Sequence, residues 1–237
     1  MPKLKSFDME SFTFPIGKDK KILFANNPGQ KTYIKNRMDR MLTKEPETIK
    51  WINTFDKDSV FFDVGANVGI YSLYSAIVKQ NKVYAFEPHA ASYKNLLDSI
   101  NLNNLSNCHA YCVALSNQVG LTNIKVKNMH EGVADNVVGE RGDYYHGCTE
   151  FPLHFLVQRK ILPQPDYIKI DVDGYEDKVI EGAMEVFRNC KALLIEIEHR
   201  HSNFVDMITA SGFTLESQHK RNDQEYNYIF VNANRKS

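Results

Sequence analysis

Long hydrophobic runs, an excess of charge of either sign and Cys-x-x-Cys pairs are all missing from this 237-residue chain. No apolar run approaches the roughly 20 residues that a membrane-spanning helix needs, and the opening Met-Pro-Lys-Leu-Lys-Ser has no apolar core of a secretory leader. Lys plus Arg and Asp plus Glu number 29 each, which gives no electrostatic reason to expect nucleic acid or an anionic membrane as partner. We therefore expect a soluble protein without a membrane span and without a nucleic-acid partner.

Cysteines are few, and the four that occur form no disulfide pattern: Cys108, Cys112, Cys148 and Cys190. Cys108 and Cys112 fall on one predicted strand, and we expect both to be small buried side chains on the same face of it. A chain of this kind is typical of a reducing compartment, so a cytoplasmic location is the default expectation. What the chain does have is the composition of an ordinary globular protein, with 43% hydrophobic and 24% charged residues.

Short apolar segments alternate with stretches of helical periodicity from Val60 onward. The predicted strands are 60–64, 82–86, 109–115, 167–171 and 192–197, followed by a closing antiparallel pair at 213–215 and 226–231. The predicted helices are 69–78, 90–102, 176–188 and 204–210. This alternation predicts a doubly wound, Rossmann-like α/β fold, in which a mostly parallel seven-stranded sheet with an antiparallel last pair is covered by helices on both faces.

The chain divides into an N-terminal extension, residues 1–50, and an α/β domain, residues 51–237. The extension is polar with scattered aromatic residues, and we expect it to form short strands and a helix. Pro46 followed by Glu47 is typical of the first turn of a helix. Within the domain, residues 127–150 are rich in Gly, Asp, His and Tyr and too long for an ordinary connection. We expect this segment to be a substrate-facing loop.

The segment Asp63-Val-Gly-Ala-Asn-Val-Gly69 connects the first strand of the domain to the helix that follows. Gly65 lets the backbone turn tightly and approach a ligand closely, and the helix that begins near Gly69 presents free backbone N–H groups. Asp63, at the end of the strand, is placed to bind the ammonium group of an amino-acid ligand. A tight turn with an incidental acid explains the segment equally well, so this motif alone does not assign a function.

Glu87 ends the second strand, just before Pro88, and favours a ligand site. In doubly wound folds an acid at this place binds the ribose hydroxyls of a nucleoside, in the crevice beyond the carboxyl ends of the strands. One acid for a ribose and one for an ammonium group describe a nucleoside that carries an amino-acid tail. A dinucleotide site would need Gly-x-Gly-x-x-Gly, and here Asn67 stands in place of the second glycine. The spacing therefore disfavours a nicotinamide cofactor.

Acidic residues also end the fourth and fifth predicted strands. Asp171 opens into the same crevice, because its strand lies beside the first one in this topology. Glu196 is embedded in Leu-Leu-Ile-Glu-Ile, where a carboxylate is costly to bury without a partner. His199 is a candidate for proton transfer, although exposed loop histidines are commoner, and Asp173 is explained as well by a helix cap as by a site role. We predict Asp171, Glu196 and His199 as catalytic residues.

Three motifs, in this order, resemble those of the FkbM-type methyltransferases: Asp63-Val-Gly-Ala-Asn-Val-Gly69, Ala85-Phe-Glu-Pro88 and Ile168-Lys-Ile-Asp-Val-Asp-Gly-Tyr-Glu176. The similarity covers about residues 43–200. It implies a class I methyltransferase fold, S-adenosylmethionine as methyl donor, and O-methylation of sugars, glycans or polyketide-like products. One departure is Asp173, where the family more often has Glu.

The resemblance adds residues to the cofactor site. The family's Asp-x-Gly-Ala-Asn and Glu-Pro motifs carry over to this sequence, and Ala114-Leu115 matches the family segment that lies near the adenine. Taken with the arguments above, the predicted cofactor-binding residues are Asp63, Gly65, Asn67, Gly69, Glu87, Pro88, Ala114, Leu115 and Asp171.

These observations predict an S-adenosylmethionine-dependent O-methyltransferase that acts on a hydroxyl of a sugar, glycan or related small molecule. One rival is a nicotinamide-dependent oxidoreductase. The other is a non-catalytic nucleoside-binding module, which would need no carboxylates at Asp171 and Glu196. A divalent cation bound by Asp171, Asp173 and Glu196 is an alternative to a carboxylate base. We favour a site without metal, because Asp173-Gly174 is typical of a turn and cap. The acceptor and the oligomeric state do not follow from the sequence.

Overall fold

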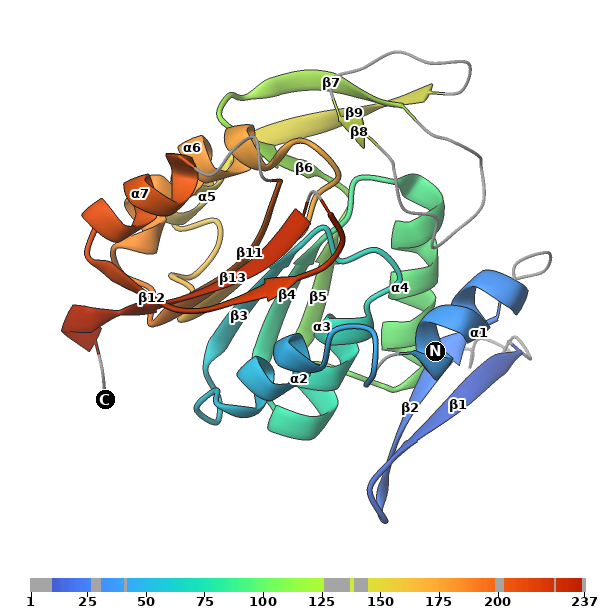
Figure 1. Ribbon diagram of the computed structural model, residues 1–237. Helices are drawn as coiled ribbons and strands as arrows, with labels where there is room; N and C mark the ends of the chain where they lie inside the picture. Colours follow the sequence, from blue (N-terminus) through green and yellow to red (C-terminus); the bar gives the residue numbers. More distant parts are fainter. Residues whose placement is uncertain are drawn as a thin grey trace.

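The computed structural model describes residues 10–26, 31–40, 42–125, 137–138, 145–198, 203–223 and 225–235 (Figure 1). The strands are β1 Ser11–Ile16, β2 Lys20–Ala25, β3 Val60–Val64, β4 Lys82–Phe86, β5 Cys108–Tyr111, β6 Ala114–Ser116, β7 Gly120–Lys125, β8 Val137–Val138, β9 Tyr145–Pro152, β10 Tyr167–Ile170, β11 Ala192–Glu198, β12 Phe213–Lys220 and β13 Glu225–Asn232. The helices are α1 Lys31–Asp39, α2 Pro46–Asn53, α3 Ile70–Tyr74, α4 Ala90–Leu102, α5 Leu153–Gln158, α6 Glu176–Phe187 and α7 Asn203–Ala210, with a π-helical turn, Ser75–Lys79, directly after α3.

A seven-stranded sheet in the order β12-β13-β11-β10-β3-β4-β5 forms the centre of the molecule. Neighbouring strands from β11 to β5 are parallel, whereas β13 is antiparallel to both of its neighbours. The strand order reverses at β3, which lies between β4 and β10. At such a reversal the crevice beyond the carboxyl ends of the strands is the usual ligand site. The predicted doubly wound α/β fold is confirmed.

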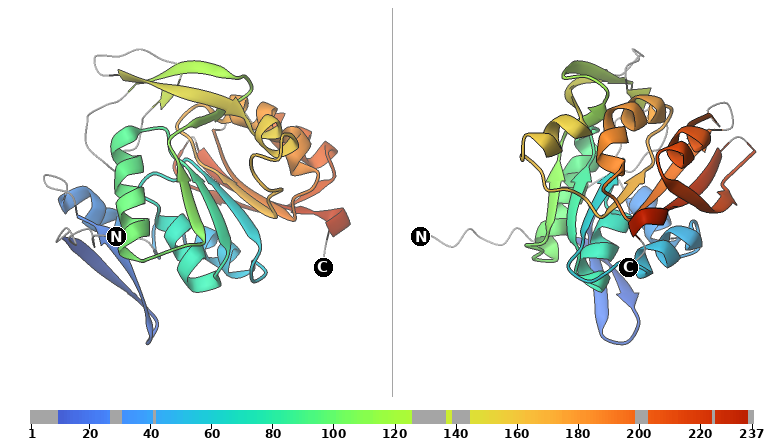
Figure 2. Two further views of the ribbon diagram at one scale, coloured as in Figure 1. Left: turned by 180° about the vertical axis from the view of Figure 1, so that it is seen from behind. Right: turned by 90° about the vertical axis from the view of Figure 1, so that its left-hand side faces the viewer.

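An apolar core lies on each face of this sheet, and helices cover both (Figure 2). On one face α2, α3 and α4 supply residues such as Trp51 and Leu73, which pack with Phe61 of β3. On the other face α5, α6 and α7 supply residues such as Ile180, which share a core with Phe62. Adjacent residues of a strand point to opposite faces, which explains why Phe61 and Phe62 belong to different cores. None of the helices within the described ranges is both long and apolar enough to cross a membrane.

The strand predicted at 109–115 is in fact two strands in two sheets, so this prediction is wrong. β5 ends at Tyr111 on the edge of the main sheet, and β6 belongs to a four-stranded sheet in the order β6-β9-β7-β8. That sheet lies above the main one in Figure 1. Gly182 lets α6 pass close to β6, because a Cβ added there would lie 1.9 Å from the Ser116 carbonyl oxygen. Cys112 lies between the two strands and is exposed, contrary to the prediction of a buried thiol.

The N-terminal hairpin β1–β2 is fixed to α4 by side-chain hydrogen bonds. The Ala25 N–H donates to Ser99 Oγ at 2.9 Å, and the Asn95 side-chain amide donates to the Ala25 carbonyl oxygen at 2.9 Å. Asn103 bonds both backbone groups of Leu23 in the same way. These bonds satisfy backbone groups of β2 that face away from β1. Helix α1 lies beside α4 and above the hairpin (Figure 1).

Candidate active site

The turn between β3 and α3 passes directly against the end of β10. Gly65 has φ +78°, and a Cβ there would lie 1.9 Å from the Asp171 carbonyl oxygen. Only glycine fits both the backbone conformation and this approach. The N–H groups of Gly65 and Ala66 both donate to the Phe86 carbonyl oxygen, at 3.0 and 3.1 Å, which ties the turn to the end of β4. Three strand ends therefore meet at one point.

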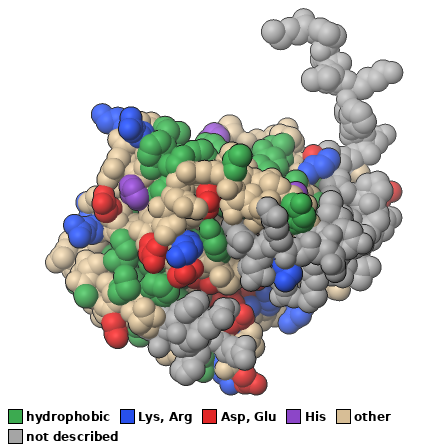
Figure 3. Space-filling model, turned by 90° about the horizontal axis from the view of Figure 1, so that it is seen from above, with side chains coloured by type: hydrophobic (Ala, Val, Ile, Leu, Met, Phe, Trp, Pro, Cys, Tyr) green, Lys and Arg blue, Asp and Glu red, His purple; other side chains and the backbone are tan. Residues whose placement is uncertain are grey.

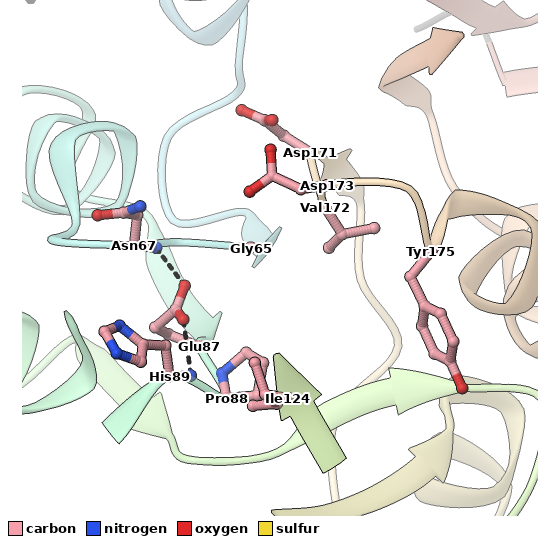
Figure 4. A pocket seen from close by; sticks show the side chains of 10 residues that line it. All are labelled: Gly65, Asn67, Glu87, Pro88, His89, Ile124, Asp171, Val172, Asp173 and Tyr175. Atoms are coloured by element: carbon pink, nitrogen blue, oxygen red, sulfur yellow. Dashed lines mark hydrogen bonds between the residues drawn. The ribbon is translucent and has the colours of Figure 1, made fainter. Parts of the chain in front are cut away.

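Glu87 lies at that point with its carboxylate enclosed by backbone. One oxygen accepts the Asn67 N–H at 2.7 Å, and the other accepts the His89 N–H at 2.8 Å (Figure 4). Glu87 is only 7% exposed. Burial raises its pKa to about 7, although the two N–H donors act in the opposite direction. The carboxylate is thus held in position, and it gains or loses its proton near neutral pH.

Glu87 lines a first hollow, with about 450 Å³ of empty space, between the ends of β3, β4 and β10. Figure 4 shows Glu87 and Asn67 on one side of this space, with Asp171 and Asp173 across from them and Tyr175 further along. Ile124 of β7 also lines it, so the four-stranded sheet contributes a wall. The first hollow is defined by Gly65, Asn67, Glu87, Pro88, His89, Ile124, Asp171, Val172, Asp173 and Tyr175.

Asp171 forms an ion pair with a lysine that is almost completely buried. Lys169 Nζ lies 2.5 Å from Asp171 Oδ2; the lysine side chain is 1% exposed, whereas Asp171 is 31% exposed. The ammonium also lies 5.0 Å from the centre of the Tyr71 ring, a cation–π distance. Burial disfavours the charged form of Asp171, but the Lys169 ammonium outweighs it and holds the pKa of this carboxyl well below its usual range. Asp171 is therefore ionised at neutral pH.

Glu196 lies beside Asp171 on the neighbouring strand β11. Lys169 pairs with Leu194 across the two parallel strands, which places Glu196 level with Asp171. Burial, and then the negative charge of Asp171, raise the pKa of Glu196 far above its usual range, so it is protonated at neutral pH. A side-chain hydrogen bond between the two carboxyl groups favours the ionised form of Asp171. Asp171 and Glu196 thus share one proton, with the negative charge on Asp171.

A second hollow, with about 460 Å³ of empty space, adjoins the first on the side of α1. Its floor holds Lys169 and Tyr71, and Glu45 is in its wall. Glu45 is 2% exposed and pairs with Arg221 at 2.7 Å and Lys44 at 3.3 Å. The second hollow is defined by Arg37, Arg40, Lys44, Glu45, Gly65, Ala66, Asn67, Ile70, Tyr71, Lys169 and Asp171. Gly65, Asn67 and Asp171 line both hollows.

Five of the residues predicted from sequence meet at the first hollow: Gly65, Asn67, Glu87, Pro88 and Asp171. Glu196 joins them through its contact with Asp171. His199 lies outside the described residues, as do residues 127–136 and 139–144 of the predicted substrate-facing loop. The roles given to all of these residues remain predictions.

Four other predicted cofactor residues do not line either hollow. Asp63 is 1% exposed; one of its oxygens accepts the Ser72 hydroxyl at 2.5 Å, and the other has no partner among the described residues. Gly69 caps α3 with φ +85°. Ala114 and Leu115 are buried in β6, within apolar packing. Asp63 lies behind the site, where it is the register partner of Lys169 on β10.

Lys169 and His89 are site residues that were not predicted from the sequence. A lysine inside the short buried strand Tyr-Ile-Lys-Ile is a signal that could have found the ion pair, because an amine there needs a charged partner. His89 is buried, and its Nδ1 lies 3.0 Å from Ser92 Oγ. Burial, and then His146, lower its pKa to about 4, so it is a neutral part of the wall at pH 7.

A family model described as the methyltransferase FkbM domain matches residues 63–230. The chain belongs to the FkbM methyltransferase family. No curated protein is significantly similar in sequence to this FkbM chain. The cofactor of this methyltransferase is S-adenosylmethionine.

Solved structures of methyltransferases share the fold. The FkbM methyltransferase from Methylobacillus flagellatus KT has a TM-score of 0.54 at 17% identity, over 75% of this chain and 44% of that one. A SAM-dependent methyltransferase from Aquifex aeolicus has a TM-score of 0.50 at 14% identity, over 86% of this chain and 98% of that one. Such low identities establish the fold alone. The FkbM chain described here spans less than half the length of the Methylobacillus protein.

The first hollow fits the nucleoside part of this cofactor. An ionised carboxylate has about four acceptor positions, and the two backbone N–H groups use one on each oxygen of Glu87. Each oxygen keeps a position for one hydroxyl of a ribose. Within the described residues, no group of three or more His, Cys, Asp or Glu side chains is arranged to hold a metal ion.

Proposed function

We propose that the chain transfers the methyl group of S-adenosylmethionine to a hydroxyl oxygen of a sugar, glycan or related small molecule. The observation that carries this proposal is an ionised, partly exposed Asp171 where the two hollows meet. A negative carboxylate at this place can orient a hydroxyl group and accept its proton. A positioned base of this kind contributes typically about 10²–10⁴-fold to rate.

Each residue of the site has a distinct part in this reaction. Bound S-adenosylmethionine supplies an already activated methyl group, so most of the rate comes from holding the reactants in line. Glu87 binds the ribose hydroxyls and fixes the cofactor. Asp171 accepts the hydrogen bond of the acceptor hydroxyl, and Lys169 with protonated Glu196 keeps Asp171 charged and in place.

The low pKa of Asp171 suits this chemistry. A hydroxyl in the ground state is far too weak an acid to lose its proton to such a carboxylate. As the oxygen–carbon bond forms, the oxygen becomes positively charged and its proton becomes strongly acidic. Asp171 therefore takes the proton late, while the carbon–sulfur bond breaks and its electron pair stays on sulfur. An ionised carboxylate suffices, and no strong base is required.

The charge distribution supports a small acceptor rather than a nucleic acid. Where the chain is described, the face seen in Figure 3 has acidic, basic and hydrophobic side chains interspersed. The whole chain has zero formal net charge. A nucleic-acid surface needs a continuous basic patch or stripe. The substrate-facing role of residues 127–150 is part of this proposal, and β9 at the end of that segment adjoins β7, which supplies Ile124 to the first hollow.

Two measurements test the proposal. Calorimetry with S-adenosylmethionine, S-adenosylhomocysteine and NAD should show binding of the first two only. The protein should then convert S-adenosylmethionine to S-adenosylhomocysteine when sugars and glycans are supplied, with an O-methyl ether identified by NMR. NAD binding would favour the oxidoreductase, and cofactor binding without turnover on any hydroxyl compound would favour the nucleoside-binding module. Methylation of nitrogen, carbon or RNA would refute the choice of acceptor.

A further inference from the structure

The second hollow has an unusually cationic mouth for a protein without net charge. Arg37 and Arg40 reach it from the end of α1, and Lys44 reaches it from the segment before α2. Of the two acids in the same lining, Glu45 is paired with Arg221 and Lys44, and Asp171 is paired with Lys169. The four basic residues that line the hollow outnumber its two acids.

Two basic residues outside the hollow are paired with acids. Lys35, one turn earlier on α1, pairs with Asp39, and Lys94 on α4 pairs with Asp98. The Arg40 guanidinium, by contrast, has no hydrogen-bond or ion-pair partner within the part of the chain that is described. A planar guanidinium beside a second cation suits bidentate recognition of a phosphate or carboxylate.

The two hollows have the arrangement that donor and acceptor need. Both hollows are open to solvent, and they adjoin one another. They share Gly65, Asn67 and Asp171, so molecules bound in the two hollows meet at the Asp171 carboxylate. In-line transfer requires donor and acceptor on opposite sides of the methyl group. With the nucleoside beside Glu87, the second hollow is left for the acceptor.

We propose that the second hollow binds an anionic acceptor, a hydroxyl compound whose phosphate or carboxylate is held by Arg37, Arg40 and Lys44 while its hydroxyl reaches Asp171. This inference rests on the proposed function and names its substrate class. The anionic group lies at the mouth, where the cations are, and the neutral part of the molecule occupies the interior beside Tyr71 and Ile70.

Calorimetry on the protein saturated with S-adenosylhomocysteine tests the inference, with glucose 6-phosphate, glucuronate and glucose as probes. We expect at least one of the two anionic probes to bind at least tenfold more tightly than glucose, and the stronger one identifies phosphate or carboxylate as the preferred group. The double variant Arg40→Gln, Lys44→Gln should lose at least tenfold in affinity for that probe. Lys35→Gln, a change of one charge on α1 outside the hollow, should bind it as the wild type does.

Three outcomes would overturn the inference. The first is that neither anionic probe binds better than glucose. The second is that the double variant binds the anionic probe as tightly as the wild type does. The third is that the double variant loses affinity for S-adenosylhomocysteine but not for 5′-methylthioadenosine, which has no amino-acid tail. That result would assign the cations to the cofactor's own carboxylate. A wild-type protein that binds no S-adenosylhomocysteine would refute the proposed function, and this inference with it.

Discussion

At the scale of single residues, the buried carboxylate of Glu87 links cofactor binding to pH. Its pKa is raised from 4.5 to about 7, and ribose hydroxyls donate to the ionised form. We expect the affinity for S-adenosylhomocysteine to be constant above about pH 8 and to fall by about tenfold per pH unit well below pH 7, because only the ionised fraction binds. Calorimetry from pH 5.5 to 8.5 measures this.

Glu87→Gln is the matched variant for this prediction, since it keeps the size of the side chain and removes the titration. It should bind S-adenosylhomocysteine more weakly by about 1.5–3 kcal/mol, roughly tenfold to over a hundredfold, with little dependence on pH. Without cofactor, the wild-type protein should lose stability as the pH rises from about 4.5 to 7, because Glu87 ionises at a lower pH in the unfolded state than in the folded state. An unchanged affinity in the variant would remove Glu87 from the site.

Asp171 and Lys169 give a second prediction. Asp171→Asn should reduce turnover at least about a hundredfold and leave S-adenosylhomocysteine affinity within a few-fold. In Lys169→Met the ammonium is gone, and burial raises the pKa of Asp171. Because the base must be ionised, activity is lost as the pH falls through that pKa. The acid limb of the turnover profile should therefore move to higher pH, whereas Lys169→Arg should restore it. Near-normal turnover in Asp171→Asn would contradict the assignment.

A third prediction concerns metal dependence and the acid next to the site, Asp173. The Gly174 N–H donates to Glu176 Oε1 at 3.1 Å, so Asp173 and Gly174 belong to a hydrogen-bonded turn that starts α6. We expect EDTA to leave turnover unchanged, because the Lys169 ammonium holds Asp171 without the help of a metal ion. Activity that disappears in EDTA and returns with Mg²⁺ would instead show a metal-assisted reaction.

The sequence predicted the acids of the site better than its cations. Asp171 and Glu87 could be found because each ends a strand, a position that a local apolar pattern reveals. Lys169 was missed although a lysine in a short buried strand is itself a local signal. Arg221 and Glu45 could not be found from any local pattern, because these two partners are far apart along the chain. Arg221 pairs with Glu45 across 176 positions, and no local pattern encodes such a contact.

At the scale of elements, helix boundaries followed from periodicity and strand membership did not. β4 and α4 have the predicted bounds. The run from His109 to Leu115 looked like a single strand because its apolar character is continuous, and only packing against α6 shows that it changes sheet. The close approach of α6 to β6 depends on Gly182, which lies some 70 positions later along the chain.

Gly182 therefore supplies the prediction for this scale. Gly182→Ala places a Cβ 1.9 Å from the Ser116 carbonyl oxygen, and either α6 or β6 must move. The cost of such overpacking is about 1–3 kcal/mol, and the better helix propensity of Ala returns up to about 1 kcal/mol of it. Urea unfolding should show a net loss of stability. Gly120→Ala, whose Cβ would be 3.8 Å from Glu150, should stay within about 0.5 kcal/mol of the wild type. Equal stability of the two variants would contradict the packing argument.

At the scale of the whole molecule, cofactor binding should stabilise the fold as a unit. The site joins β3, β4 and β10 from the middle of the sheet, so unfolding destroys it completely. At a concentration one hundred times its Kd, S-adenosylhomocysteine adds about 2.7 kcal/mol. For a chain of this length that raises the Tm by about 5–11 °C. NAD at the same concentration should leave the Tm unchanged, and an equal shift with NAD would return the oxidoreductase to consideration.

The position of β13 has a consequence for how the protein is made. β13 lies between β11 and β12, although it follows both in the sequence. While residues 225–232 are still inside the ribosome, the backbone groups of β11 that later bond β13 have no strand beside them. Apolar residues of β11 such as Leu194 and Ile195 then also lack their neighbours on β13. An open edge of this kind is a template for pairing with another chain. A nascent chain therefore passes through an aggregation-prone stage, and a nonsense mutation shortly before Glu225 would make that stage permanent.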